Sequence, residues 1–231
     1  MIAVTFALPA ESADFVKRLR DRARKGGIVH GSIGDRRIAV LHTGVGKTTC
    51  RRRMAELLQD RQFDLLISAG FAGALRDDMA VGDLLLAENF STLDLKRVRG
   101  TLAHPNLHLG RLATLDHIIA SAVERNEVAR ETGAIAVDME TEFIARACAE
   151  YGLPLLCLRA ISDTPARSLP APAHVLFDLE RQKTKLSRLA GYLIKHPATM
   201  LRLASFARQI RSARRGLATA LEDLLKSDGI N

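Results

Sequence analysis

Acidic side chains stand just after several buried strands that the sequence predicts: Glu11, Asp138, Glu140 and Asp163. The carboxyl ends of parallel strands meet at one edge of a sheet, where ligands bind in α/β proteins. We therefore expect these carboxyl groups to share a cleft and to act on a bound ligand. Helix capping or simple solvation could explain each acid alone, but neither requires the whole set to lie on one edge.

Glycines follow two of the same strands and would let a ligand approach the backbone closely. Gly44 and Gly46 come after the apolar run at residues 38–42, and Gly70 and Gly73 come after the run at 64–68. We expect Gly70 and Gly73 to end their strand. Together with the acids, these turns predict a small-molecule site.

The elements that must position these residues alternate between apolar runs and amphipathic segments. The predicted strands cover residues 2–8, 38–42, 64–68, 83–87, 112–115, 134–138 and 155–161. Strands that are apolar on both faces and alternate with helices predict a largely parallel sheet covered on both sides. The fold class is therefore α/β. We expect one catalytic domain over residues 1–172 and a basic helical extension over 173–231, packed on or beside it.

Composition narrows the function classes. The chain of 231 residues is 47% hydrophobic and 4% aromatic, which argues against disorder. Its three cysteines show no metal-ligand spacing and predict neither a disulfide framework nor a zinc site. No apolar run is long enough to span a bilayer, and the first residues do not resemble a secretion signal. We expect a cytoplasmic protein without metal or other cofactor.

Positive charge is concentrated near the C-terminus. Residues 181–215 hold ten basic and no acidic residues, whereas the rest of the chain holds 24 basic and 26 acidic residues. Pro197 divides this region into two amphipathic helices. One interpretation is a helical hairpin packed on the domain with its basic residues in water. The other is a helix pair that binds an anionic membrane surface, at the inner membrane. Nucleic acid is not expected, because stacking aromatic residues are nearly absent.

Two motifs do not support the function that they suggest. Gly44 to Thr49 resembles a phosphate-binding P-loop, but Leu41 stands where that pattern requires its first glycine. The histidines at 104, 108 and 117 share no ligand spacing with a carboxylate or a cysteine, so we interpret them as surface residues.

Five motifs in order resemble the nucleoside phosphorylase and methylthioadenosine/S-adenosylhomocysteine nucleosidase superfamily. They are Ala7 to Glu11, Thr43 to Lys47, Ser68 to Gly73 with Val81-Gly82-Asp83, Ala136 to Glu140, and Arg159 to Asp163. The resemblance spans about residues 2–165, and the last two motifs are the specific ones. The stretch from Gly133 to Pro170, with the basic tail, is most similar to the hopanoid-associated branch, which is linked to removing adenine from adenosylhopane.

The resemblance implies a three-layer α/β sandwich around a mixed, largely parallel sheet, and cleavage of a purine N-glycosidic bond by hydrolysis or phosphorolysis. Asp163 would protonate the leaving base, oriented by Ser162, and Glu11 would activate the nucleophile. Glu140 would bind the ribose hydroxyls, with Met139 against the sugar. The remaining expected substrate contacts are Asp138, Phe71, Gly70, Gly44, Ile118, Ile119 and Arg159. Relatives are commonly oligomers, so a homo-oligomer is expected, with a dimer favoured.

Two departures from the family pattern leave a different class of function open. Phe71 stands where the nucleosidases usually have a small hydroxyl residue near the water. Ile118 stands where an aromatic residue normally stacks on the base, so adenine's edge would be read mainly by backbone near Ile118 and Ile119. The phosphate-clamping arginines of true phosphorylases have no clear match, and Glu11 after the first strand favours water over phosphate. The alternative is a catalytically altered member that binds a nucleoside or a membrane.

Overall fold

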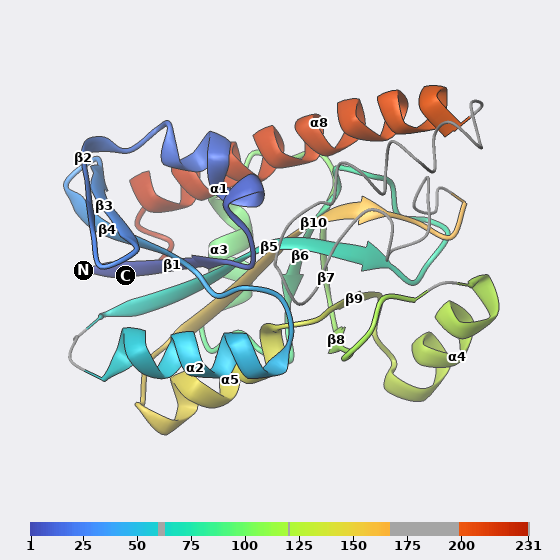
Figure 1. Cartoon of the computed structure of the whole chain (residues 1–231), viewed down its shortest axis with the longest axis horizontal. Coiled ribbons are helices and arrows are strands. Elements are labelled where there is room, and N and C mark those ends of the chain that lie inside the picture. The colour runs from blue at the N-terminus through green and yellow to red at the C-terminus, as the bar shows by residue number, and fades with distance from the viewer. Residues whose placement is uncertain (60–62, 120, 167–198, 231) are drawn as a thin grey trace.

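One ten-stranded mixed sheet organises the protein (Figure 1). The structure is a computed structural model, and it describes residues 1–59, 63–119, 121–166 and 199–230, with the main chain alone for 199–202. The strand order is β2-β3-β4-β1-β5-β10-β6-β7, and β9 joins β5 and carries β8. β1 pairs in parallel with β4 and β5, and β5 pairs in parallel with β10. The expected α/β class with a largely parallel central sheet is confirmed.

The strands are β1 (Ile2–Phe6), β2 (Arg20–Lys25), β3 (Ile28–Ile33), β4 (Arg36–His42), β5 (Leu65–Ala74), β6 (Leu84–Ala87), β7 (Leu107–Gly110), β8 (Leu112–Thr114), β9 (Ala136–Asp138) and β10 (Leu155–Asp163). The helices are α1 (Pro9–Val16), α2 (Lys47–Leu58), α3 (Leu95–Gly100), α4 (Ala122–Thr132), α5 (Thr141–Glu150) and α8 (Thr199–Lys226).

Alternating side chains build a core on each face of the sheet. Val40, Val4, Ile67 and Leu156 lie in register across four strands and belong to one buried cluster, which α1 and α8 cover. The adjacent residues on the same strands, for example Ala3 and Leu66, belong to a second buried cluster, which α2 and α5 cover. Figure 1 shows these helices on opposite sides of the sheet, so the molecule has three layers. Successive side chains on a strand point to opposite faces, which explains why continuous apolar runs fill both cores.

The structure contains elements that the sequence did not predict, among them β7, α3, α4 and the β2–β3 hairpin, and one strand is longer than expected. A charged hairpin of β2 and β3 extends the sheet edge, although the β2 sequence, Arg20–Lys25, is fully exposed and lacks an apolar pattern. Strand β5 does not end at its glycines and continues to Ala74. Pairing with β10 on one side and β9 on the other holds this glycine-rich part in the sheet. The strand thus carries both glycines into the region where the acids gather.

The second half of α8 is part of the main core. Its apolar side chains, among them Leu217, Leu221 and Leu224, are buried in the same cluster as β1 and β10. Two ion pairs join α8 to the N-terminal region, Arg214 with Asp14 and Arg18 with Glu222. The predicted helix before Pro197 lies outside the described residues. No helix in the part of the chain that the structure describes is long and apolar enough to cross a membrane.

Candidate active site

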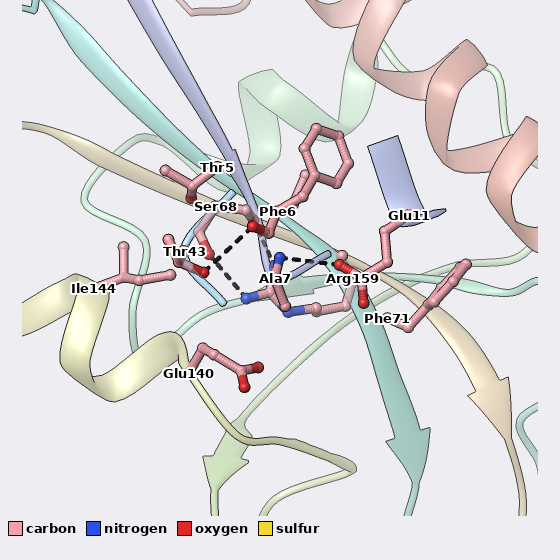
Figure 2. A pocket seen from close by; sticks show the side chains of 12 residues that line it. Thr5, Phe6, Ala7, Glu11, Thr43, Ser68, Phe71, Glu140, Ile144 and Arg159 are labelled. Atoms are coloured by element: carbon pink, nitrogen blue, oxygen red, sulfur yellow. Dashed lines mark hydrogen bonds between the residues drawn. The ribbon is translucent and has the colours of Figure 1, made fainter. Parts of the chain in front are cut away.

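A small cavity lies at the carboxyl ends of β1 and β4, beside the middle of β5 (Figure 2). Its volume is about 10 Å³, close to the space that a single water molecule needs. Its walls are Thr5, Phe6, Ala7, Glu11, Thr43, Ser68, Ala69, Gly70, Phe71, Glu140, Ile144 and Arg159. The cavity thus brings together Glu11 and Glu140, which lie 129 positions apart in the sequence, from two different sides of the sheet edge.

Glu11 lies in the first turn of α1, directly after β1. Its Oε2 accepts hydrogen bonds from the backbone N–H groups of Ala7 at 3.0 Å and Leu8 at 3.3 Å, so it also caps its own helix. A Cβ atom at Gly70 would lie 3.3 Å from the same oxygen, which shows that glycine lets the carboxyl group approach β5. Desolvation by burial raises the pKa of Glu11 from 4.5 to about 7, although the two backbone bonds act in the opposite direction.

Glu140 approaches the cavity from the turn between β9 and α5. Its Oε1 accepts a hydrogen bond of 3.0 Å from the backbone N–H of Gly46, whose φ of +86° favours glycine at this position. Burial, and after it the charge of Asp138, raise the pKa of Glu140 to about 8. Both carboxyl groups of the cavity therefore bind a proton more readily than an exposed glutamate does.

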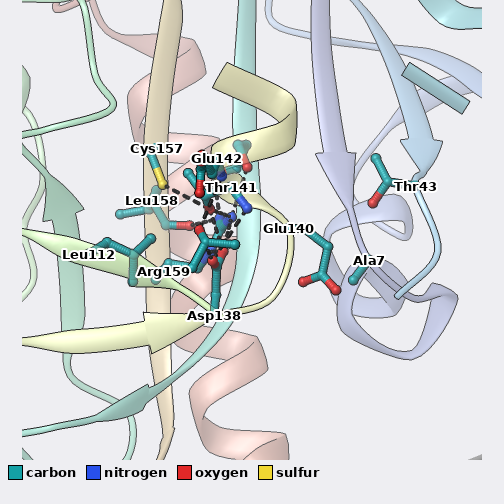
Figure 3. A network of polar contacts seen from close by, with 12 residues as sticks. Ala7, Thr43, Leu112, Asp138, Glu140, Thr141, Glu142, Cys157, Leu158 and Arg159 are labelled. Atoms are coloured by element: carbon teal, nitrogen blue, oxygen red, sulfur yellow. Dashed lines mark hydrogen bonds and ion pairs between the residues drawn. The ribbon is translucent and has the colours of Figure 1, made fainter. Parts of the chain in front are cut away.

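Asp138 and Arg159 form a buried polar network beside the cavity (Figure 3). Oδ1 of Asp138 accepts hydrogen bonds from Thr114 and from the Thr141 backbone, and Oδ2 accepts from the Thr141 hydroxyl and from Arg159 at 3.0 and 3.1 Å. Figure 3 shows the Glu140 carboxyl group pointing away from this network, toward Ala7. Protein groups occupy both oxygens of Asp138 and fix the turn that carries Glu140; its expected substrate contact stays a prediction.

Arg159 lines the cavity, but its donors are engaged. Besides Asp138, the guanidinium group donates to the carbonyl and the hydroxyl of Ser68 at 2.7 and 2.8 Å, to the Leu158 carbonyl and to the Thr141 hydroxyl. Opposite charges nearby, Asp138 and Glu11 among them, raise the pKa of Arg159 still further above its already high value, against the effect of burial. Arg159 therefore has a structural role in the described residues, and its expected substrate contact stays a prediction.

Asp163 ends β10 and does not line this cavity. Ser162 Oγ donates to its Oδ1 at 2.7 Å, as an orienting residue would, and also lies 3.2 Å from the Ala72 carbonyl oxygen. Arg125 of α4 pairs with its Oδ2. Arg159 and Asp163 are four residues apart on β10, which corresponds to about 13 Å along a strand. Asp163 thus lies further toward the carboxyl end of β10 than Arg159, which lines the cavity.

The remaining expected contact residues fall into two groups. Phe71 and Gly70 line the cavity. Gly44 lies next to Thr43 in the wall, and its N–H donates to the Ala7 carbonyl at 2.9 Å. Met139 is half-buried between Asp138 and Glu140. Ile118 and Ile119 do not line the cavity; Ile119 is buried against Leu75 and Ala134 instead.

Three polar residues of this region were not predicted. Thr5 Oγ1 is buried in the cavity wall and has no hydrogen-bond partner among the residues that the structure describes, and Ser68 holds Arg159 from a strand that is otherwise apolar. A hydroxyl inside an apolar strand is a signal that could have identified both. Arg125 stands in a polar helix where nothing in the sequence distinguishes it. Within the described ranges, no group of three His, Cys, Asp or Glu side chains is placed to hold a metal ion.

Similar proteins and solved structures identify the fold and the superfamily of the chain. The family model of the phosphorylase superfamily matches residues 1–101 and 95–195. A 5′-methylthioadenosine/S-adenosylhomocysteine nucleosidase of Staphylococcus aureus is 24% identical over 162 residues, which cover 58% of this chain and 71% of the relative. The nucleosidase structure from S. pneumoniae, with a transition-state inhibitor, is 23% identical with a TM-score of 0.72, over 97% of this chain and 98% of that one.

A second solved structure is similar over its whole length. It is the futalosine hydrolase of Helicobacter pylori, which is 18% identical with a TM-score of 0.68 and covers 96% of both chains. At such identities the solved structures establish the fold. The family model matches well over half of the residues, and the chain therefore belongs to the phosphorylase superfamily.

Proposed function

We propose that this protein cleaves the N-glycosidic bond of a purine nucleoside, with water as the nucleophile and adenine as the leaving base. The observation that carries the proposal is the pair Glu11 and Glu140, two carboxyl groups of raised pKa in one cavity at the carboxyl ends of parallel strands. Titratable groups with perturbed pKa values are enriched at active sites. The similar nucleosidases support the substrate class.

Glu11 is the proposed general base. A base is most effective when its pKa lies near the working pH, and burial brings the Glu11 carboxyl to about 7. The hydrogen bonds from the Ala7 and Leu8 backbone both fall on Oε2, which leaves Oε1 for a water molecule. As the bond to the base breaks, the ribose ring becomes cationic. The oxygen of the water molecule would then bond to C1′ of the ribose while Glu11 takes a proton from that water.

Glu140 is the proposed ribose ligand. Gly46 fixes its Oε1, and the side chain is directed away from the Asp138 network. Its carboxyl group would bind the sugar hydroxyls opposite the attacking water, with Met139 packed against the sugar. Binding those hydroxyls would favour the ionised form of Glu140, because a carboxylate accepts their hydrogen bonds.

Asp163, oriented by Ser162, is the proposed acid. It would donate a proton to N7 of the purine, so that the base departs neutral while Glu11 accepts the proton of water. The products are the free base and the sugar with a hydroxyl group at C1′, and one proton passes back from Glu11 to Asp163 to restore the site. We also propose that backbone groups near Ile118 and Ile119 form hydrogen bonds with the edge of adenine.

The charges around the cavity favour water over phosphate. Arg159 is the only cationic side chain among the described residues that line the cavity, and five protein acceptors occupy its donors. The two carboxyl groups would repel an anion, and Phe71 fills the wall beside Glu11 with an aromatic ring. Phosphorolysis needs donors for phosphate that these described walls do not supply.

We also propose that the 5′ group is large and apolar, as in adenosylhopane. Its support is the sequence resemblance together with the exposed Arg208, Arg211 and Arg215 of α8, which suit the anionic surface where such a lipid would reside. Vesicle sedimentation tests this part: the chain should bind anionic vesicles and lose that binding when these three arginines become glutamines. Equal adenine release from methylthioadenosine and adenosylhopane would contradict the lipid preference. A homo-oligomer remains our expectation, which analytical ultracentrifugation can test.

The central experiment measures free base. The protein is incubated with adenosine, methylthioadenosine and adenosylhopane, with and without phosphate, and adenine and the sugar product are quantified. We expect adenine and a reducing sugar, with no sugar 1-phosphate. Glu11→Gln and Asp163→Asn should each lower the rate by about 10²-fold or more, whereas the exposed Glu56→Gln should not change it. Binding of adenine without any base release would instead support the alternative, a nucleoside-binding module.

A further inference from the structure

One arginine of α4 is buried beside the end of β10, unlike the rest of its helix. Arg125 is 5% exposed and is the only fully buried residue of α4, whose other residues are exposed or half-buried. Arginine is almost never fully buried unless it is paired. The buried charge of Arg125 therefore needs a charged partner.

The partners of Arg125 lie on two neighbouring central strands. Nη2 pairs with Asp163 Oδ2 at the end of β10, and Nη1 donates to the Ala74 carbonyl at the end of β5, at 2.6 Å. Planar guanidinium groups form two such bonds at a fixed relative geometry. Arg125 therefore links α4 to the carboxyl edge of the sheet, where Asp163 is expected to meet a nucleobase.

Gly73 makes room for this pair. A Cβ atom at this position would lie 3.2 Å from Asp163 Oδ2 and 3.3 Å from Arg125 Nη1, closer than ordinary van der Waals contact. The backbone of β5 and the two charged groups are therefore in direct apposition. A side chain at residue 73 would therefore crowd the ion pair.

The Asp163 carboxyl group is held on both oxygens. Ser162 Oγ donates to Oδ1, and Arg125 contacts Oδ2. A carboxyl group has about two sites on each oxygen, so one on each oxygen remains for the proton that Asp163 donates and for the base, while both contacts persist. Binding a base does not require the ion pair to break, and the two contacts together fix the direction of the remaining sites.

We propose that Arg125 is a positioning residue, which fixes the Asp163 carboxyl group in the orientation that the departing nucleobase requires. The proposal rests on the function proposed above and adds to it a residue that contacts neither the cavity nor the water. A displacement of about 1 Å in a reacting group can lower a rate by about 10²-fold. Loss of the Arg125 contacts should therefore act on turnover more than on substrate affinity.

The test compares Arg125→Lys and Arg125→Ala with the wild-type chain, using methylthioadenosine as substrate and circular dichroism to verify folding. Lysine keeps the charge, so that Asp163 is not left unpaired, but its single nitrogen cannot reproduce the two-nitrogen geometry. We expect Arg125→Lys to lower kcat by about 10- to 100-fold with KM changed less than about 3-fold. Millimolar guanidinium chloride should restore part of the activity of Arg125→Ala. Arg18→Ala, which removes a distant ion pair with Glu222, should show neither effect.

The outcomes separate this proposal from the function on which it rests. Wild-type kcat in Arg125→Lys, an increase in kcat, or a folded Arg125→Ala that guanidinium does not rescue would each overturn the role of Arg125 alone. Absence of base release by the wild-type chain would overturn the proposed function. In that case the role of Arg125 is tested by measuring adenine binding with titration calorimetry. Binding at least about 10-fold weaker in Arg125→Lys than in the wild type supports a role in presenting Asp163 to the base. Equal or undetectable binding overturns that role.

Discussion

Replacing Glu11 by glutamine should stabilise the protein at alkaline pH while it abolishes base release. Burial raises the pKa of Glu11 from 4.5 to about 7. Between these two pH values the folded protein binds more protons than the unfolded chain, so the stability contributed by this group falls as the pH rises. Each pH unit corresponds to about 1.4 kcal/mol, so ionised Glu11 costs the fold about 3 kcal/mol above pH 7.

Glutamine removes this cost because it has the same shape and no charge to desolvate. Its amide oxygen can still accept the two hydrogen bonds from the Ala7 and Leu8 backbone. At pH 8 we expect Glu11→Gln to unfold with a free energy about 3 kcal/mol larger than the wild type. In a protein of this size that is roughly 6–12 °C in Tm. At pH 4.5 the two proteins should be nearly equal in stability.

The assay is urea denaturation followed by circular dichroism at several pH values from 4.5 to 8. Glu56→Gln is the matched control, because Glu56 lies on the surface of α2 in an ion pair with Arg52; its effect should stay within about 0.5 kcal/mol at every pH. The reasoning is refuted if Glu11→Gln gains nothing at pH 8, or if its gain is equally large at pH 4.5. Either result would mean that the Glu11 carboxyl is not desolvated in the folded protein.

Three further substitutions probe the surroundings of the site. Thr5→Val should increase the free energy of unfolding by about 1 kcal/mol, measured in urea, because it removes a buried hydroxyl without a partner among the described residues. Gly73→Ala should lower base release at least about 10-fold, measured as free adenine, because its Cβ would crowd the ion pair at the end of β10. Arg159→Met should destabilise the protein by about 3–5 kcal/mol in urea, because it leaves Asp138 buried without its counter-charge.

Each of these predictions has its own control or contrary outcome. A loss of stability in Thr5→Val would show that the hydroxyl has a partner in solution. Gly100→Ala, where a Cβ would meet nothing within 4 Å, should leave base release unchanged, and an equal loss there would remove the steric explanation for Gly73. Adding Asp138→Asn to Arg159→Met should recover part of the stability; no recovery would mean that the buried charge is not the cause.

Much of the fold follows from local pattern. Apolar runs such as 155–161 are strands because only a sheet covered on both faces can bury every one of their side chains, and the family motifs are continuous segments of sequence. The β2–β3 hairpin escaped prediction because an exposed edge strand needs no apolar alternation. The glycines of β5 predict the end of a strand, because glycine is unfavourable in isolated strands. In the structure two partner strands hold these glycines in the sheet.

The sequence by itself determined which acids follow the central strands and to which family the chain belongs, since both are properties of order along the chain. Tertiary structure decided what each acid does. Burial raised the pKa of Glu11 and Glu140, three protein partners engaged Asp138, and an arginine from a polar helix paired with Asp163. These outcomes depend on desolvation and on contacts between residues distant in sequence, which no local pattern of residue types encodes.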